Sequence, residues 1–233
     1  MNKKKNFVSL RCMEDPEIRS LRVQTWFRAV RLASGKTPAQ LEREFSQPRG
    51  VPRMLPRSCI WEKYARGEVV PRSGRRRDGA LNLVERVEAR YPGTKQWLEW
   101  PLWRLADKAP MTMSEIKTIY EELPEPIRSM FIATKNGACG IFWRRPIEID
   151  HACEILLRYR GIHGLIAILA IVKEAEIIQN QYQHQVGIRA AMEYLRSVAV
   201  KASQPMADDI YAYLTKYIKF QWKSAGYFNV IAD

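Results

Sequence analysis

The sequence predicts an all-α protein in which a basic N-terminal domain, residues 1–110, is followed by an all-helical interaction domain, residues 111–233. Three observations lead to this expectation. Apolar residues recur at the three- and four-residue spacing of amphipathic helices along most of the chain. Gly and Pro stand at the ends of those segments, where helices stop and start. The charge balance and the kind of motif both change near Ala109-Pro110.

The excess of positive charge lies almost wholly in the first half. The chain of 233 residues has 38 Lys and Arg against 25 Asp and Glu, a net charge of +13. Residues 1–110 hold 24 of the basic residues and 12 of the acidic ones, which leaves the second half nearly neutral. A basic half joined to a neutral one is typical of a polyanion-binding domain with a partner domain. With 46% hydrophobic residues, both halves can bury ordinary cores.

Nucleic acid and an anionic membrane are the two polyanions to be compared. A membrane-surface protein needs a basic amphipathic helix with a broad apolar face, whereas the basic residues here lie mostly in loops and turns. The longest apolar run, residues 162–172, contains His163 and is much shorter than the roughly 20 residues that cross a bilayer. We therefore expect nucleic acid as the partner and no membrane.

The cysteines are scattered, with no C-x-x-C motif and no accompanying His pair; they are Cys12, Cys59, Cys139 and Cys153. This pattern favours neither a zinc site nor a disulfide framework, and it fits a reducing compartment. The N-terminus has Lys residues but lacks the apolar stretch of a signal peptide. We expect a cytoplasmic protein without a metal or another cofactor.

The first 45 residues predict a loose basic arm followed by two helices. Residues 1–20 form the arm. The first helix runs from Leu21 to about Ala33, with apolar residues at helical spacing, and Gly35 ends it. Thr37-Pro38 starts the second helix, because Thr is a good N-cap and Pro fits the first helical position. That helix runs through Phe45.

Two basic loops flank the next expected helix. Prolines at 48, 52 and 56 make the first an extended loop, since Pro lacks the amide donor that a helix requires. Ser58 then caps a short helix that continues through Arg66 and ends at Gly67. The second basic loop, residues 71–79, precedes an amphipathic helix from Leu81 to Tyr91.

The stretch FRAVRLASGKTPAQLEREFS, followed by WEKYARGEVVP, resembles the helix-turn-helix of the Cro/C1-type (XRE) DNA-binding family. The resemblance covers roughly residues 22–72 and rests on these positions in order: Arg31, Ala33, Ser34-Gly35, Leu41, Phe45, Tyr64, Gly67 and Pro71. It implies that the third helix enters the major groove of duplex DNA. Two features depart from the family. About eleven basic, proline-rich residues separate the second and third helices, and Glu42 stands where a small residue is usual.

Within the expected recognition helix, Trp61 and Tyr64 are three residues apart and face the core. The residues between and before them then face outward, and Arg66, near the end, contacts a phosphate. Arg can bond guanine through two hydrogen bonds, and Glu can accept from cytosine. With the arginines of both loops, the candidate nucleic-acid-binding residues are Arg49, Arg53, Arg57, Ser58, Cys59, Glu62, Lys63, Arg66, Arg72, Arg75, Arg76 and Arg77.

Two segments have two interpretations each. The loop from Arg72 to Arg77 either lies along phosphates or enters a narrow minor groove, or it is a solvated, flexible loop. Trp97, Trp100 and Trp103 either stack on exposed bases or belong to the core. Their helical spacing favours the core, and Pro101 prevents one continuous helix through them.

The second half predicts helices throughout. Helices are expected over Ser114–Leu123 and Pro126–Thr134, with a turn at Asn136-Gly137. Asp150 is expected to cap a helix that runs through Tyr159, and Leu165–Gln181 is expected as a central buried helix. Two more follow from apolar stripes, which are Ile188, Ala191, Met192, Leu195, Val198 and Ala199, and then Ile210, Leu214, Tyr217 and Ile218. The last helix has further aromatics that predict either a protein interface or packing against the tail: Tyr211, Tyr213, Phe220 and Trp222.

No group of residues predicts catalysis. His151, His163 and His184 are dispersed, and His163, among apolar residues, is expected in the core. Cys153 is not spaced to pair with His151 as a nucleophile. Glu121-Glu122 has the pattern of a solvated helix end. The sequence contains no phosphate-binding glycine loop, and the acidic metal cluster of a nuclease is not visible in it.

We therefore expect a non-enzymatic protein that binds duplex DNA, a bacterial or mobile-element transcriptional regulator in which residues 1–110 suffice for binding. Residues 111–233 would serve self-association, ligand sensing or a protein partner. The alternative is a structural subunit of a larger nucleoprotein complex, of the phage-defence or RNA-guided type, where the nucleic acid can be RNA. A dimer on a palindromic site would indicate the regulator, and a monomer stable only with partner chains would indicate the subunit.

Overall fold

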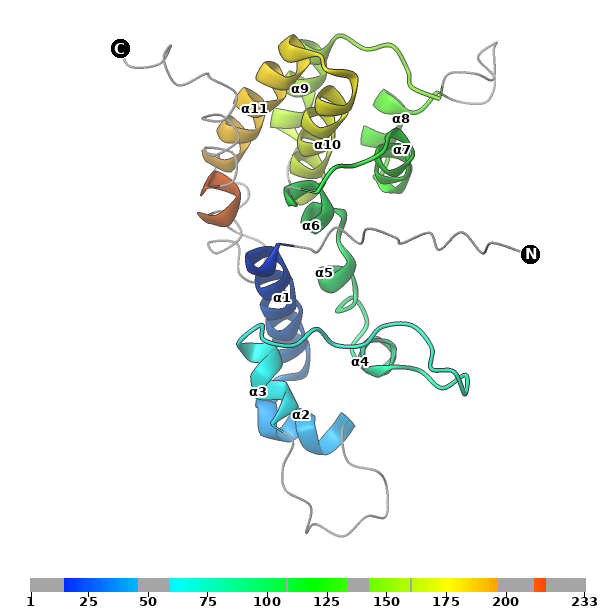
Figure 1. Ribbon diagram of the computed structural model, residues 1–233, viewed down its shortest axis with the longest axis vertical. Helices are drawn as coiled ribbons and strands as arrows, with labels where there is room; N and C mark the ends of the chain where they lie inside the picture. Colours follow the sequence, from blue (N-terminus) through cyan, green and yellow to red (C-terminus); the bar gives the residue numbers. More distant parts are fainter. Residues whose placement is uncertain are drawn as a thin grey trace, which may run out of the picture.

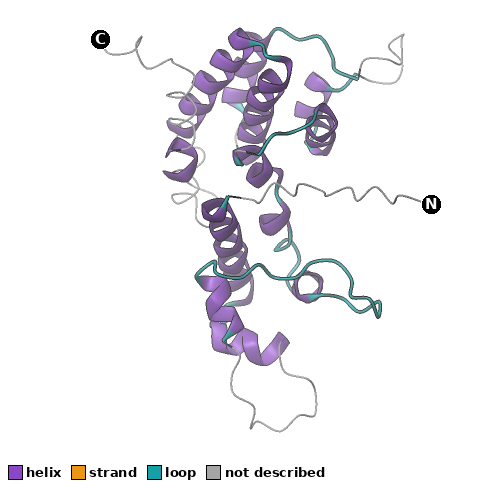
Figure 2. Cartoon of the chain, in the orientation of Figure 1, coloured by secondary structure: helices purple, strands orange, loops and turns teal. Residues whose placement is uncertain are grey.

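The computed structural model describes residues 15–45, 59–107, 109–133, 143–159, 161–196 and 212–216. The all-α prediction is confirmed, because these residues form helices and their only β contacts are two isolated bridges (Figure 2). A helical turn at 212–216 follows helices α1 (Pro16–Ser34), α2 (Pro38–Phe45), α3 (Ile60–Ala65), α4 (Leu83–Arg90), α5 (Gln96–Glu99), α6 (Pro101–Ala106), α7 (Met113–Glu122), α8 (Ile127–Phe131), α9 (Ile149–Arg158), α10 (Ile162–Ile178) and α11 (Gln181–Arg196).

The helices pack around two hydrophobic cores, one in each lobe of an elongated molecule (Figure 1). The first core lies among α1 to α5 and includes Trp26, Leu41, Trp61 and Val87. The second lies around α10 and includes residues of α6 to α11. The prediction of a central buried helix is confirmed, since nearly every residue of α10 up to Ala175 is buried.

Helix α1 takes part in both cores. Ile18 and Leu21, near its start, belong to the second core, whereas Val23 and Trp26 belong to the first. The two cores separate along the chain at Pro101, which follows Leu98 of the first core and precedes Leu102 of the second. The boundary expected at Ala109-Pro110 stays a prediction.

The expected loose arm over residues 1–20 is wrong in its last five residues, which are helical. Asp15 caps α1, because its carboxylate accepts the N–H of Glu17 at 2.9 Å, and Pro16 fills the first helical position. The physical reason for the early start is a long-range one: Ile18 is fully buried in the second core. Residues 1–14 lie outside the described residues.

The sequence signals between α1 and α2 are confirmed. Gly35 ends α1 in a left-handed conformation with φ of 66°, and its N–H donates to the Arg31 carbonyl. Thr37 and Gln40 form a reciprocal cap at the start of α2. The Thr37 N–H donates to Gln40 Oε1 at 2.8 Å, and the Gln40 N–H donates to Thr37 Oγ1 at 3.4 Å.

Three local predictions in the rest of the chain are wrong. Helix α3 has Cys59 and not Ser58 at its N-cap. Helix α9 has Glu148 and not Asp150 at its N-cap, so Asp150 lies in the first turn. His163 is exposed and not in the core, because the second position of α10 points away from the bundle that buries its neighbours Ile162 and Gly164.

Parts of several predicted elements lie outside the described residues. These parts are the proline-rich loop, the turn at Asn136-Gly137, the end of the first apolar stripe (Val198 and Ala199), and, from the last helix, Ile210, Tyr211, Tyr217, Ile218, Phe220 and Trp222. Leu214 of that helix is described, and it is buried in the second core. None of the described helices has the length and apolar character needed to cross a membrane.

Candidate nucleic-acid interface

Helix α3 presents to solvent the face that the sequence analysis assigned to recognition. Trp61 and Tyr64 are buried in the first core, where Trp61 stacks on Trp26 with ring centroids 5.8 Å apart. On the opposite face Cys59, Lys63 and Arg66 are exposed, and Glu62 is partly exposed. Arg49, Arg53, Arg57 and Ser58 lie outside the described residues.

A buried carboxylate fixes the N-terminal turn of α3. Glu42 of α2 is only 5% exposed, and its Oε2 accepts the backbone N–H of Trp61 at 3.4 Å. The first backbone N–H groups of a helix have no partner within the helix, so an acceptor from another element can take the place of a side-chain cap. This contact accounts for Glu42 at a position where the resemblance leads one to expect a small residue, and for a helix that begins after Cys59 without a Ser cap.

The C-terminal end of α3 rests directly on α1. Gln24 donates its Nε2–H to the Arg66 carbonyl at 3.1 Å. Gly67 has φ of +70°, and a Cβ at this position would lie 2.2 Å from Ser20 Oγ and 2.6 Å from the Ser20 carbonyl oxygen. Only Gly allows this backbone conformation and this close approach together. Both ends of α3 are therefore held by residues of other helices.

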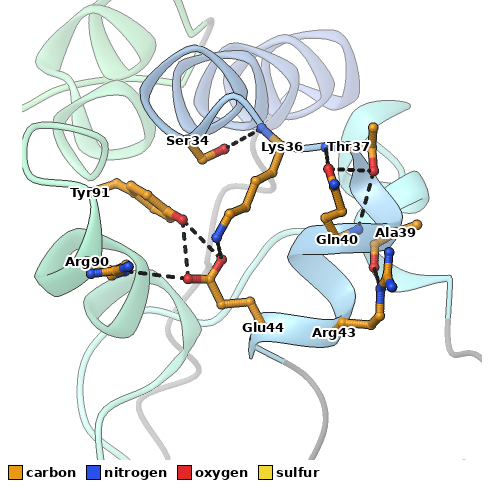
Figure 3. Close-up of polar contacts among 9 residues, drawn as sticks. All are labelled: Ser34, Lys36, Thr37, Ala39, Gln40, Arg43, Glu44, Arg90 and Tyr91. Atoms are coloured by element: carbon orange, nitrogen blue, oxygen red, sulfur yellow. Dashed lines mark hydrogen bonds and ion pairs between the residues drawn. The ribbon is translucent and has the colours of Figure 1, made fainter.

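Helix α2 is held against α4 by a charged cluster (Figure 3). Glu44 accepts from Lys36 Nζ at 2.7 Å and from the Tyr91 hydroxyl at 3.0 Å, and Arg90 Nε lies 3.5 Å from its other oxygen. Burial opposes ionisation of Glu44, but the hydrogen bonds from Lys36 and Tyr91 outweigh it and lower the pKa of this carboxyl. The cluster fixes the position of α4, and the second basic loop leads into the start of that helix.

Residues 72–82, which we name the arginine arm, form a hydrogen-bonded hairpin between α3 and α4. Arg75 and Leu81 are paired in an antiparallel bridge. The Arg76 N–H donates to the Ala80 carbonyl at 2.8 Å, and the Asn82 N–H donates to the Gly74 carbonyl at 3.0 Å. The arm extends sideways from the first lobe (Figure 1). Its internal hydrogen bonds give the loop a defined backbone, and its contact with nucleic acid stays a prediction.

The arm exposes all four of its arginines, Arg72, Arg75, Arg76 and Arg77. At the tip Asp78 lies 3.6 Å from Arg76, an exposed pair that contributes little to stability. The base of the arm is joined to α4 because Glu85 accepts the Gly74 N–H at 2.6 Å. The arm thus places several cations in solvent on a defined backbone.

A groove separates α3 from the arginine arm. Its apolar lining consists of Ile60, Tyr64, Val69, Val70, Leu81 and Leu83, and its basic lining consists of Arg72, Arg76 and Arg86. A second hollow adjoins it on the arm and is lined by Arg72, Arg75, Arg76, Arg77, Asp78 and Asn82. The sequence predicts that both α3 and the arm bind nucleic acid, but no local pattern in it predicts the groove between them.

Arg86 was also missed by the sequence analysis. It extends from α4, donates to the Phe45 carbonyl, and lies over the Phe45 ring with 5.8 Å between the guanidinium carbon and the ring centroid. The charge of Arg86 in an amphipathic helix gives no local sign of this contact, which joins residues 41 positions apart. Arg66, by contrast, was predicted to contact a phosphate. In the structure its guanidinium donates to the two carboxylate oxygens of Glu68, at 2.5 and 3.1 Å.

The Trp-rich segment belongs to the cores, as its spacing favoured. Trp103 is 4% exposed, and its Nε1–H donates to the Trp97 carbonyl at 2.9 Å. Trp97 and Trp100 are in edge contact with ring centroids 5.1 Å apart, and each packs against one of the two cores. Pro101 ends the first turn of helix and begins the next, as predicted.

Titratable groups outside this surface are the remaining candidates for chemistry. In the described ranges, no three His, Cys, Asp or Glu side chains converge as metal ligands would. Cys153 is buried, and this burial raises the pKa of its thiol to about 12, so it is not a ready nucleophile at neutral pH. His151, two residues before it on α9, is exposed.

Comparison of the chain with protein-family models, with curated proteins and with solved structures finds no significant match. The resemblance to the Cro/C1-type helix-turn-helix family therefore stays a prediction that rests on the residues quoted for it.

Proposed function

We propose that this chain is a non-enzymatic protein that binds duplex DNA through α3 and the arginine arm. The observation that carries the proposal is the arm itself, which holds four exposed arginines across a groove from Ile60 and Tyr64 of α3. Lys and Arg on one surface supply the sequence-independent part of DNA affinity by neutralising phosphates. An exposed helical face next to them supplies side chains that can reach base edges.

The biological role that we propose first is transcriptional regulation in a bacterium or a mobile element, in the cytoplasm. The second lobe would then provide self-association or a protein partner. This role requires that α3 distinguish base sequences, a task for Glu62 and Lys63 on its outward face.

One observation favours the alternative, a structural subunit of a nucleoprotein complex. Helix α3 has only six residues, and Arg66 at its end is bonded to Glu68. Few side chains are therefore placed to read bases, whereas the arm offers many cations to the backbone. A protein that mainly holds the nucleic-acid backbone has this balance of contacts.

The decisive experiment compares two triple variants of the full chain in fluorescence anisotropy with labelled duplex DNA. Arg75→Ala/Arg76→Ala/Arg77→Ala removes three charges from the arm, and Arg158→Ala/Arg189→Ala/Arg196→Ala removes three exposed charges from the second lobe. We expect weaker binding only in the arm variant. Its log–log salt slope should fall by roughly 0.9 for each phosphate that the arm no longer neutralises. Equally weakened binding in the two variants would refute the assignment of the surface.

Selection of duplexes from a random pool separates the two roles. A regulator should enrich a defined site, and Glu62→Ala should change the enriched bases. A subunit that holds the backbone should enrich no site and should be recovered with other chains from its host.

A further inference from the structure

The groove between α3 and the arginine arm combines two kinds of surface. Its floor is apolar, and three of its residues, Val69, Val70 and Leu81, are 36–37% exposed. Arginines from both sides, Arg72 and Arg76 on the arm and Arg86 on α4, line its edges. A purely electrostatic surface has no need of apolar lining residues, so the groove indicates a ligand that has both apolar and anionic parts.

A sugar–phosphate strand has both parts. The carbon faces of deoxyribose are apolar, and each phosphate carries one negative charge. Sugars can therefore contact Val69 and Leu81 while phosphates approach the arginines at the edges. Charge complementarity supports a nucleic-acid strand over an acidic peptide as well, because planar guanidinium groups bind phosphate oxygens through two parallel hydrogen bonds.

We propose that one strand of the DNA backbone lies in this groove, with α3 on its major-groove side and the tip of the arginine arm in the adjoining minor groove. The inference rests on the proposed function, and it adds the path of the strand and the groove that each element enters. Helix α3 and the arm lie on opposite sides of the protein groove. A DNA strand that lies there therefore has the major groove of the duplex on one side and the minor groove on the other.

The build of the arm fits entry into a minor groove. The turn that joins Arg76 to Ala80 places Arg77 at the tip, and Gly79 adopts a φ of +80° there, which allows the chain to reverse within a few residues. The hydrogen bonds between the two sides of the arm hold the hairpin together, and the arm extends sideways from the first lobe (Figure 1). A narrow minor groove has an enhanced negative potential that attracts inserted arginines. A·T-rich tracts are thus the preferred neighbours of the α3 site.

The apolar floor favours DNA over RNA. A ribose 2′-hydroxyl that faces Val69, Val70 or Leu81 would lose its hydrogen bonds to water without gaining others. In addition, the deep and narrow major groove of an A-form duplex does not admit a helix such as α3. The proposal therefore predicts duplex DNA, and not duplex RNA of the same sequence, as the ligand.

The first test uses netropsin, a small molecule that occupies the minor groove of A·T-rich duplexes. Netropsin should weaken binding of the full chain to such a duplex by about tenfold or more, since the arm tip and the small molecule compete for one groove. In Arg77→Ala binding should be weaker at the outset and the effect of netropsin small. In the matched control Arg189→Ala, on the second lobe, both quantities should equal those of the unmodified chain.

The second test probes the floor of the groove with a matched pair of exposed apolar residues. Leu81→Asn should weaken DNA binding by roughly fivefold, because it removes apolar contact with the sugars. Ile155→Asn on α9, 37% exposed against 36% for Leu81, should leave binding unchanged. The circular dichroism spectrum of both variants should match that of the unmodified chain.

The outcomes separate this inference from the proposed function. In one outcome the triple arm variant loses binding, but netropsin and Leu81→Asn have no effect. That outcome supports DNA binding by the arm and overturns the proposed path of the strand. Equal affinity for duplex DNA and duplex RNA overturns it as well. If the full chain binds no duplex DNA at all, the proposed function itself fails.

Discussion

Replacement of Gly67 by Ala tests how closely α3 depends on α1. Gly67 has φ of +70°, and a Cβ there would lie 2.6 Å from the Ser20 carbonyl oxygen and 2.9 Å from its Cα. Gly35 offers a matched control, because its φ is +66° and a Cβ there would meet no atom within 4 Å. Ala in the left-handed conformation costs roughly 1–2 kcal/mol, and this cost is common to both positions.

The overlap with Ser20 adds a second cost at Gly67 alone. Backbone atoms of Ser20 cannot rotate away as a flexible side chain can, so α3 or α1 must shift, and overpacking of this kind costs about 1–3 kcal/mol. The free energy of unfolding should therefore fall by about 1–2 kcal/mol in Gly35→Ala and by about 2–5 kcal/mol in Gly67→Ala. Urea unfolding followed by circular dichroism measures both values. Equal decreases in the two variants would refute the close approach of α3 to α1.

Three further predictions concern single groups. Arg144→Ala should lower the free energy of unfolding by about 3–5 kcal/mol in urea titrations, because it leaves the buried Glu174 carboxylate without the guanidinium that now bonds it at 2.9 and 3.2 Å. The folded-state pKa of Glu44 lies below its ordinary value, so its ionised form stabilises the folded state at neutral pH, and this stabilisation is lost as the pH falls through the folded pKa. In Glu44→Gln the free energy of unfolding should therefore decrease less steeply as the pH is lowered. In a Cys12→Ser/Cys139→Ser background at pH near 8, an aromatic disulfide reagent should modify the exposed Cys59 and spare Cys153, whose thiol has a pKa of about 12. Loss of the fast phase on adding Cys153→Ser, with none on adding Cys59→Ser, would contradict this assignment.

Local signals in the sequence predicted several helix ends correctly. The end of α1 at Gly35, the cap by Thr37 and the break at Pro101 each depend on the conformational limits of one residue and its immediate neighbours. The central position of α10 follows equally from the composition of its own residues. Such features need no knowledge of the rest of the chain.

The contacts that shape the candidate interface join residues far apart in sequence, and sequence reasoning missed them. Glu42 caps α3 across 19 positions, and Arg86 meets Phe45 across 41 positions. Before the fold is known, Glu42 is only a charged residue where a small one is usual. The groove beside α3 has the same origin, because its lining comes from α3, α4, the arm and the segment that joins α3 to the arm, and no local pattern encodes their relative placement.

The division of helix α1 between two cores changes how DNA binding has to be tested. The sequence predicts that residues 1–110 suffice, but Ile18, Leu102, Trp103 and Leu105 within this range are buried in the second core, which lies mostly beyond it. A fragment cut at residue 110 would expose these side chains to water, at roughly 1.5–3 kcal/mol for each large apolar group. Loss of DNA binding by that fragment would then follow from unfolding of α1, on which α3 rests through Ser20 and Gln24, as readily as from a wrong assignment of the surface. Charge-removing variants of the full chain keep both cores intact, so a change in their affinity can be assigned to the surface itself.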